Sequence, residues 1–138
     1  MQIVVFKLGD AYYGINTEFI DVISLEEPLA RVPLVEAFIK GIINVRGKIM
    51  PVLCLKEFLG LGVENEEDSR RVLFLTIKDL SAGLFVDSVI GVYSIEENSI
   101  LSTPDICSTD NVIGVCKLED NLVSLFDVVK MFNMGDNV

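Results

Sequence analysis

The amino-acid sequence predicts an all-β fold in which two small five-stranded β-barrels are packed together, with short helices. Three observations lead to this prediction: the chain repeats itself internally, its apolar runs are short and separated by tight turn signals, and 51% of its 138 residues are hydrophobic. About five short strands per half fit two barrels or one sandwich. We favour twin barrels because a curled five-stranded sheet closes its own edges.

The internal repeat relates residues 41–59, GIINVRGKIMPVLCLKEFL, to residues 114–132, GVCKLEDNLVSLFDVVKMF. In both copies a glycine opens a mostly apolar run, a polar turn follows, and a second apolar run leads into a helix-like tail. The copies differ most at the turn, which reads NVRG at residues 44–47 and KLED at residues 117–120. The shared pattern predicts a shared fold, and the different turns indicate where the two copies would differ in function.

The length predicts a single domain, residues 1–138. Within it we expect two approximate halves, residues 1–62 and 70–134, joined by a polar, acidic linker at residues 63–69. A half of about 70 residues buries only ~60% of its unfolded surface by itself. The halves are therefore expected to pack on each other.

Runs of β-branched, aromatic and other apolar residues predict the strands. In the first half these runs are residues 2–8, 11–15, 22–25, 42–45 and 49–53. In the second half they are residues 71–77, 82–86, 112–118 and 122–126. Turn-forming residues between successive runs predict hairpin turns at Gly9–Asp10, Arg46–Gly47, residues 78–81 and residues 119–121.

Capping side chains mark the predicted short helices. Asn16–Thr17 precedes one helical turn, and Asp127 caps a final helix that runs through residue 132. A further short helix is predicted at residues 55–59, and Asp87 takes the cap-like place of Thr17 in the second half.

Prolines and polar residues predict the remaining irregular segments. Pro28 and Pro33 confine residues 26–34 to loop or edge-strand conformations, and a polar loop follows Ile95. Pro51 lacks an amide donor, so its strand is expected to expose one edge or to begin a bulge.

The charge of the chain excludes several classes of partner. The formal net charge is -10, and no run of basic residues is longer than Arg70–Arg71. Binding to nucleic acid or to an anionic membrane surface requires clustered Lys and Arg, so neither is expected. No apolar stretch approaches the ~20 residues of a membrane-spanning helix, and no signal peptide is visible. The sequence is interpreted as cytoplasmic.

The residues needed for catalysis are missing or badly placed. The chain has no histidine, which excludes Ser-His-Asp and Cys-His arrangements and nearly every zinc site. Asp87–Ser88 lacks the glycine of an aspartic-protease motif, and the carboxylates between residues 64 and 68 lack the spacing of a calcium loop. The thiols of Cys54, Cys107 and Cys116 are expected to be free, and most of them buried. We therefore predict no enzyme activity, no metal and no cofactor.

Arg46 is the residue that a surface function would use most readily. It occupies the tip of a predicted hairpin beside Lys48, whereas the second copy of the repeat has Glu119 at the equivalent position. A guanidinium group can form directional hydrogen bonds to the carboxylates or carbonyls of a protein partner.

Residues 41–52, GIINVRGKIMPV, resemble the signature of the CheW family of bacterial chemotaxis coupling proteins, Gly-[apolar]-[apolar]-Asn-Leu-Arg-Gly-x-[apolar]-[apolar]-Pro-[apolar]. Residues 84–89, LFVDSV, resemble a second family segment, and residues 122–132 resemble the terminal strand and helix. The resemblance covers residues 2–134. It implies two SH3-like five-stranded β-barrels in a non-enzymatic scaffold that couples methyl-accepting receptors to the regulatory domain of the histidine kinase CheA, in the cytoplasm at membrane receptor arrays.

The same resemblance implies the residues that bind each partner. The receptor would be bound in a groove between the barrels by Asn44, Val45, Arg46, Gly47, Ile49, Val86 and Val89. The kinase would be bound by Ile20, Val22, Ile23 and Gly41.

Two positions depart from the family pattern. Val22 stands where the family commonly has Glu, and Cys54 stands where an Asp usually follows the signature. The first change would alter kinase docking, and the second would remove the cap of the helix at Leu55. Two alternative functions are an SH3-like module that binds peptides in another signalling pathway and a small barrel-like hydrolase.

Overall fold

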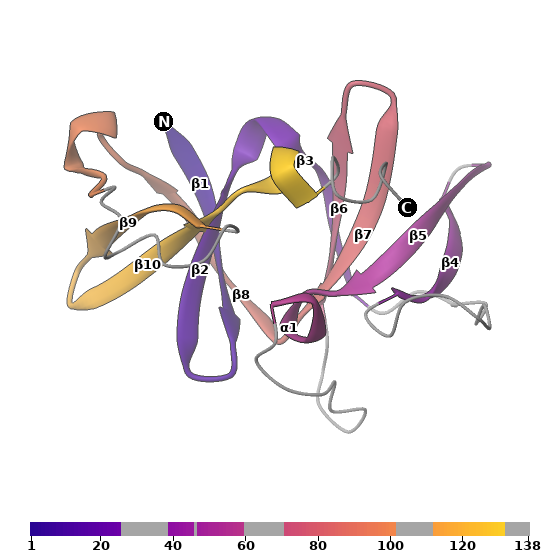
Figure 1. Ribbon diagram of the computed structural model, residues 1–138, viewed down its shortest axis with the longest axis horizontal. Helices are drawn as coiled ribbons and strands as arrows, with labels where there is room; N and C mark the ends of the chain where they lie inside the picture. The colour runs from indigo at the N-terminus through magenta and orange to yellow at the C-terminus, as the bar shows by residue number, and fades with distance from the viewer. Residues whose placement is uncertain (26–38, 46, 60–70, 102–111, 132–138) are drawn as a thin grey trace. The chain divides into compact units, whose positions relative to one another are not determined.

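The computed structural model describes residues 1–25, 39–45, 47–59, 71–101 and 112–131 (Figure 1). The fold is all-β, with two five-stranded sheets and a few short helices, as predicted from the sequence. The chain divides into two compact units, and each sheet belongs to one of them. In the described part of the chain, the helices lack the length and apolar character needed to span a membrane.

Unit 1 consists of Met1–Phe19 and Val89–Val138. Its sheet has the strand order β8-β1-β2-β10-β9. The bounds of these strands are Gln2–Leu8 (β1), Ala11–Asn16 (β2), Ser88–Ser94 (β8), Val112–Leu118 (β9) and Asn121–Phe126 (β10). Its core contains Ile3, Val5, Ile95, Cys116, Val123 and Leu125.

Unit 2 is the contiguous segment Ile20–Ser88. Its sheet has the strand order β3-β6-β7-β5-β4. The bounds are Ile20–Leu25 (β3), Ile39–Val45 (β4), Lys48–Cys54 (β5), Arg71–Ile77 (β6) and Leu80–Val86 (β7). Its core contains Ile43, Met50, Val52, Val72, Phe74 and Phe85.

The two sheets are interleaved along the sequence. The first two strands of each sequence half form a sheet with the last three strands of the other half. The chain consequently passes between units at Phe19/Ile20 and again at Ser88/Val89, whereas the linker predicted at residues 63–69 lies outside the described residues. The boundaries of the units therefore differ from those of the predicted halves, residues 1–62 and 70–134.

A short parallel pairing joins the strands from different halves in each sheet. Val123–Leu125 of β10 pairs with residues 12–14 of β2, and Val52–Cys54 of β5 pairs with residues 83–85 of β7. Leu125 faces Gly14, and the equivalent Val52 faces Gly83. A Cβ atom on Gly14 would lie 3.2 Å from Leu125 Cδ2, and one on Gly83 would lie 3.3 Å from Val52 Cγ2, so both glycines allow a close approach of the partner strand.

The short helices begin where the capping residues predict. Asn16 Oδ1 accepts a hydrogen bond of 3.0 Å from the amide of Glu18 at the start of η1 (Thr17–Phe19). Asp127 Oδ1 accepts one of 3.0 Å from the amide of Lys130, in the helical residues 128–131. These two predicted caps are confirmed.

The first copy of the repeat lacks the cap that the second one has. Cys54 is the N-cap residue of α1 (Leu55–Phe58), and its side chain makes no capping hydrogen bond. Cys54 and Cys116 are buried and form no disulfide bond, as expected, and burial raises the pKa of the Cys116 thiol. Cys107 lies outside the described residues.

The prediction that Asp87 caps a helical turn was wrong. Strand β8 begins at Ser88, directly after Asp87, and the Asp87 carboxylate lies 3.7 Å from Lys56 Nζ instead. Because Gly83 and Gly14 occupy equivalent places, counting along each strand makes Asp87 equivalent to Glu18 rather than to Thr17. The error arose because sequence similarity aligned the two strands one residue out of register.

Nine of the ten described strands lie over predicted runs, whereas β8 was not predicted, and β3, β4 and β7 begin two or three residues before their predicted starts. Four hairpins have two-residue turns, and those at residues 78–79 and 119–120 are shorter than the predicted turns at residues 78–81 and 119–121. Pro51 pairs with Ile42 of β4, and pairing with β7 begins one residue later at Val52. Pro51, which has no amide hydrogen to donate, therefore lies in β5 just before its pairing with β7 begins. A second 3-10 helix, η2 (Glu97–Ser99), lies in the predicted loop after Ile95, and residues 26–34 lie outside the described residues.

The interleaving predicts which fragments fold. Because residues 20–88 contain all five strands of unit 2, a fragment of these residues is expected to fold without the rest of the chain. A fragment of residues 1–69 has the same length but contains parts of two incomplete sheets, so it is expected to remain unfolded. Amide dispersion in ¹⁵N–¹H NMR spectra measures both. A dispersed spectrum from residues 1–69 together with a collapsed one from residues 20–88 would contradict the interleaved topology.

Candidate functional site

The β4–β5 hairpin presents different residues on its two faces. Residues that pair across the hairpin share a face, and Ile42 pairs with Pro51 while Asn44 pairs with Ile49. These four side chains are exposed, and Ile49 is 65% exposed. The opposite face belongs to the core of unit 2. The inner face of the hairpin therefore packs into the core, and its outer face is exposed and mostly apolar.

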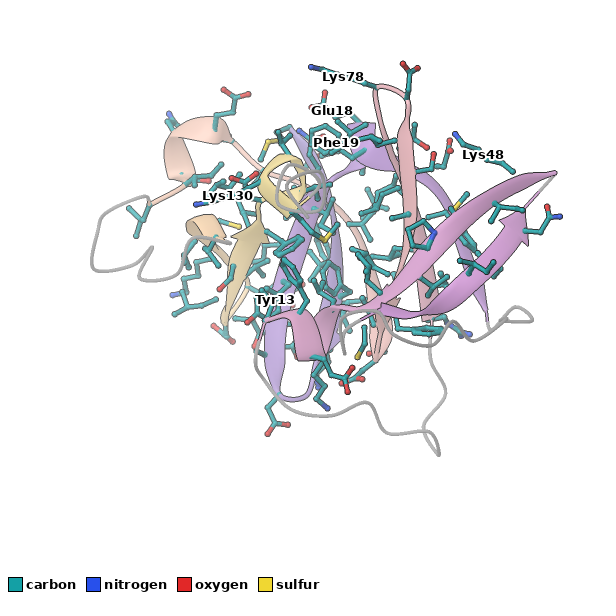
Figure 2. The ribbon with its side chains drawn as sticks, turned by 45° about the vertical axis from the view of Figure 1, so that its right-hand side comes forward. Tyr13, Glu18, Phe19, Lys48, Lys78 and Lys130 are labelled. Atoms are coloured by element: carbon teal, nitrogen blue, oxygen red, sulfur yellow. The ribbon has the colours of Figure 1, made fainter. Side chains whose placement is uncertain are left out.

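The turn of this hairpin is shaped by one side chain and one glycine. Asn44 Oδ1 accepts a hydrogen bond of 2.9 Å from the amide of Gly47. Gly47 has φ of +83°, in the region that favours glycine. Lys48 follows at the start of β5 and is exposed (Figure 2). The signature residues Asn44 and Gly47 thus fix the backbone of the turn, while Arg46 and the side chain of Val45 lie outside the described residues.

The equivalent hairpin β9–β10 in unit 1 keeps the apolar residue but changes the turn. Leu122 takes the place of Ile49 and is 66% exposed. Its turn contains Glu119 and Asp120, both exposed, and Glu119 has φ of +55° at the first turn position. The positive φ of Gly47 is at the second turn position instead. The two hairpins therefore differ in both backbone conformation and charge.

The other two residues predicted to bind the receptor are less accessible. Val86 ends β7 in unit 2 and is 2% exposed, whereas Val89 lies on β8 and is half-buried. The two residues fall in different units, and the structure places Asn44, Gly47 and Ile49 together in one hairpin of unit 2. The burial of Val86 leaves its side chain little surface for a partner.

The residues predicted to bind the kinase lie on the two end strands of one sheet. Ile20, Val22 and Ile23 belong to β3 and pair with β6, with a register irregularity between Ile20 and Val22. Gly41 lies on β4 at the other end of the sheet order and is buried. Ile20 is half-buried, and the side chains of Val22 and Ile23 lie outside the described part of the chain.

Sequence reasoning missed two members of the exposed face. Ile42 is 37% exposed and Pro51 is exposed, and both lie on the same face as Ile49. Cross-strand pairing around the turn is the signal that would have found them, because a two-residue turn fixes which residues face each other.

No constellation for metal-dependent chemistry is present in the described ranges. Among these residues, no three His, Cys, Asp or Glu side chains lie close enough together to hold a metal ion. What the described surface of the hairpin offers is an apolar patch beside a positive charge, which is suited to binding another protein.

Comparisons with known proteins give one consistent result. The family model described as "CheW-like domain" matches residues 2–136. The "Chemotaxis protein CheW" of Bacillus subtilis is 29% identical over 129 residues, which cover 91% of this chain and 83% of that protein. The protein of the same name from Thermotoga maritima is 25% identical over 135 residues, covering 94% and 86%.

A solved structure also matches most of the chain. It is the crystal structure of the scaffolding protein TtCheW from Thermoanaerobacter tengcongensis, with 34% sequence identity and a TM-score of 0.83. The match covers 92% of this chain and 84% of that chain. The fold and the sequence signature therefore agree.

The geometry of the turn predicts the effect of replacing its glycine. A Cβ atom on Gly47 would meet no heavy atom within 4 Å, so Gly47→Ala is opposed by backbone conformation alone. The substitution is expected to lower the free energy of unfolding by about 1 kcal/mol. Urea denaturation measures the change, and Lys48→Ala, at the exposed neighbouring residue, is the control with an unchanged midpoint. Equal midpoints for the two variants would show that residue 47 does not require a positive φ.

Proposed function

The chain belongs to the CheW-like domain family, and from this premise we propose that it is a non-enzymatic scaffold that joins a CheA-type histidine kinase to methyl-accepting chemotaxis receptors. The observation that carries the proposal is the exposed apolar face of the signature hairpin, held in place by the bond between Asn44 and Gly47. On this proposal the protein acts in the cytoplasm at membrane receptor arrays.

The receptor side of the proposal rests on the β4–β5 hairpin. Ile49, with Ile42 and Pro51 on the same face, offers apolar area whose removal from water would supply affinity. Arg46, in the turn of the signature, and the exposed Lys48 would supply orientation and selectivity, because charged groups at an interface fix register more than they add affinity. Asn44 and Gly47 would act through the shape of the turn.

The kinase side of the proposal rests on the two end strands of the unit 2 sheet. An end strand has main-chain groups on the side directed away from its sheet, and these can pair with or pack against a partner. Ile20, Val22 and Ile23 lie on such a strand. Val22, which replaces a common glutamate of the family, would make this contact more apolar.

Neither alternative function is favoured by the comparisons. The two relatives and the solved structure described above are named as chemotaxis or scaffolding proteins, and none of the three is named as a hydrolase. An SH3-like module for proline-rich peptides would present grouped aromatic side chains. Tyr12 and Tyr13 are half-buried on β2, where Tyr13 stacks on the buried Phe6 with ring centroids 6.2 Å apart.

The first prediction from this proposal concerns the turn arginine. Arg46→Glu is expected to leave the free energy of unfolding unchanged within about 0.5 kcal/mol, because surface turn substitutions change stability little. It is expected to reduce retention of the protein by receptor-containing membranes, since it reverses the charge of the turn. Co-sedimentation with receptor and kinase measures retention. Retention equal to that of the unsubstituted protein would count against the assigned role of Arg46.

The second prediction uses the repeat to provide a matched control. Ile49→Asp places a carboxylate in the apolar face and is expected to weaken receptor co-sedimentation about tenfold, which corresponds to about 1.4 kcal/mol. Leu122→Asp changes a residue of nearly the same exposure at the equivalent position and is expected to leave receptor binding intact. If both variants lose binding equally, the hairpin of unit 2 has no special role in receptor docking.

A further inference from the structure

Unit 1 contains an apolar pocket of about 240 Å³. Its buried lining is formed by Ile3, Leu125, Phe126 and Val128. Three large apolar side chains that are more than a third exposed also line it: Met1, Ile113 and Val129. Exposed apolar residues that gather at one concave place indicate a binding site more strongly than single ones do. None of the residues in this lining belongs to the predicted receptor- or kinase-binding sets.

The polar part of the lining is acidic. Glu18 is exposed on η1 next to Phe19 (Figure 2), and the bond from its amide to Asn16 Oδ1 fixes this turn. Asp127 is half-buried and also lines the pocket. Among the described residues of the lining there is no Lys or Arg, and the ammonium group of Met1 donates to the carbonyl of Ile95 at 3.1 Å. The two carboxylates outnumber this one ammonium group, so the rim as a whole favours a cation.

At the equivalent place in unit 2, identified by the internal repeat, a lysine lies close to a carboxylate. There, Lys56 Nζ lies 3.7 Å from the carboxylate of Asp87. Asp87 is equivalent to Glu18 by the sheet register, and Lys56 is equivalent to Val129 by the repeat. Unit 1 thus keeps the acidic residue and has valine in place of the lysine, and both of these residues line the pocket.

We propose that this pocket is a docking site for a protein segment that inserts one apolar side chain and places a lysine or arginine beside Glu18. The partner's cation takes the position that Lys56 occupies relative to Asp87 in unit 2. The partner's apolar side chain contacts Val129, Ile113 and the buried lining.

Size and charge select this occupant over others. A cavity of about 150 Å³ holds a benzene molecule, so about 240 Å³ accommodates a Leu, Met or Phe side chain. An anionic lipid surface or a nucleic acid would bring negative charge to a carboxylate-bearing rim. A second copy of this chain would bring a net charge of -10. A basic, partly apolar protein segment has the complementary chemistry.

The probe for this chemistry is phenethylammonium, which joins a benzene-sized group to a cation. Phenylacetate, which joins a similar group to an anion, is the matched comparison. In ¹⁵N–¹H NMR titrations of the full chain, phenethylammonium is expected to shift the amides of Gly14, Phe19 and Val129. Its affinity is expected to be about fivefold higher than that of phenylacetate, and the difference is expected to shrink as salt is added. Equal affinities, or shifts confined to other residues, would overturn the proposal.

A variant copied from the repeat provides the second measurement. Val129→Lys rebuilds in unit 1 the lysine of unit 2, and it is expected to reduce phenethylammonium binding at least fivefold because its own ammonium group occupies the place beside Glu18. Leu122→Lys adds the same charge at an exposed residue outside the pocket lining and is expected to leave binding unchanged. Unchanged binding by Val129→Lys would refute the assigned role of Glu18. Concentration-dependent shifts of the same amides without any probe would identify a second copy as the occupant and would also refute the proposal.

Discussion

The short parallel pairing between strands from different sequence halves is the constraint on which the rest of this structure depends. Each sheet is complete only when β10 joins β2, or β5 joins β7, and each junction has three paired residues. Gly14 and Gly83 lie at these junctions, under the side chains of Leu125 and Val52. A Cβ atom on Gly14 would lie 3.0 Å from Ile3 Cδ1, closer than nearly all real Cβ contacts. Glycine at these two positions therefore lets the partner strands pack closely without a shift of the core side chains around them.

These junctions also determine where the hairpins present their outer faces. In β4–β5, the residues that alternate with the exposed ones are buried in the core, so the hairpin has a fixed orientation relative to its own sheet. Residues on the outer face can change without disturbing that orientation, because they contribute little to packing. Ile49 and Leu122 keep the same exposed position in the two copies, while the turn beside them changes from glycine with a neighbouring lysine to two carboxylates. The two copies of the repeat therefore form similar hairpins whose turns carry different charges.

The sequence predicted what is local and missed what depends on distant pairing. Nine of the ten described strands, the hairpin turns and the caps at Asn16 and Asp127 follow from residues that are neighbours in the chain, and the structure contains them. The exchange of strands between halves was not predictable, because alternating apolar residues specify a face of a strand but not its partner. The same limit applies to Val86, which the family resemblance assigned to the receptor groove and which is buried. The resemblance to a family supplied the site residues, whereas composition had only excluded other functions.

The sequence did not reveal the pocket of unit 1, because its lining comes from both ends of the chain. The pocket differs from the equivalent place in unit 2 by having Val129 where unit 2 has Lys56, and this change has a small effect on stability. A partly exposed pair such as Lys56–Asp87, with side chains 23% and 33% exposed, contributes about 0 to 1 kcal/mol to stability. A valine in place of that lysine is therefore compatible with the same fold. A side chain at Gly14 is a different case, since its Cβ atom would lie 3.0 to 3.2 Å from the side chains of Ile3, Val123 and Leu125, which would all have to shift slightly. Differences between the two units are therefore expected at partly exposed positions that contribute little to stability. At such a position a partner can supply the charge that one unit lacks.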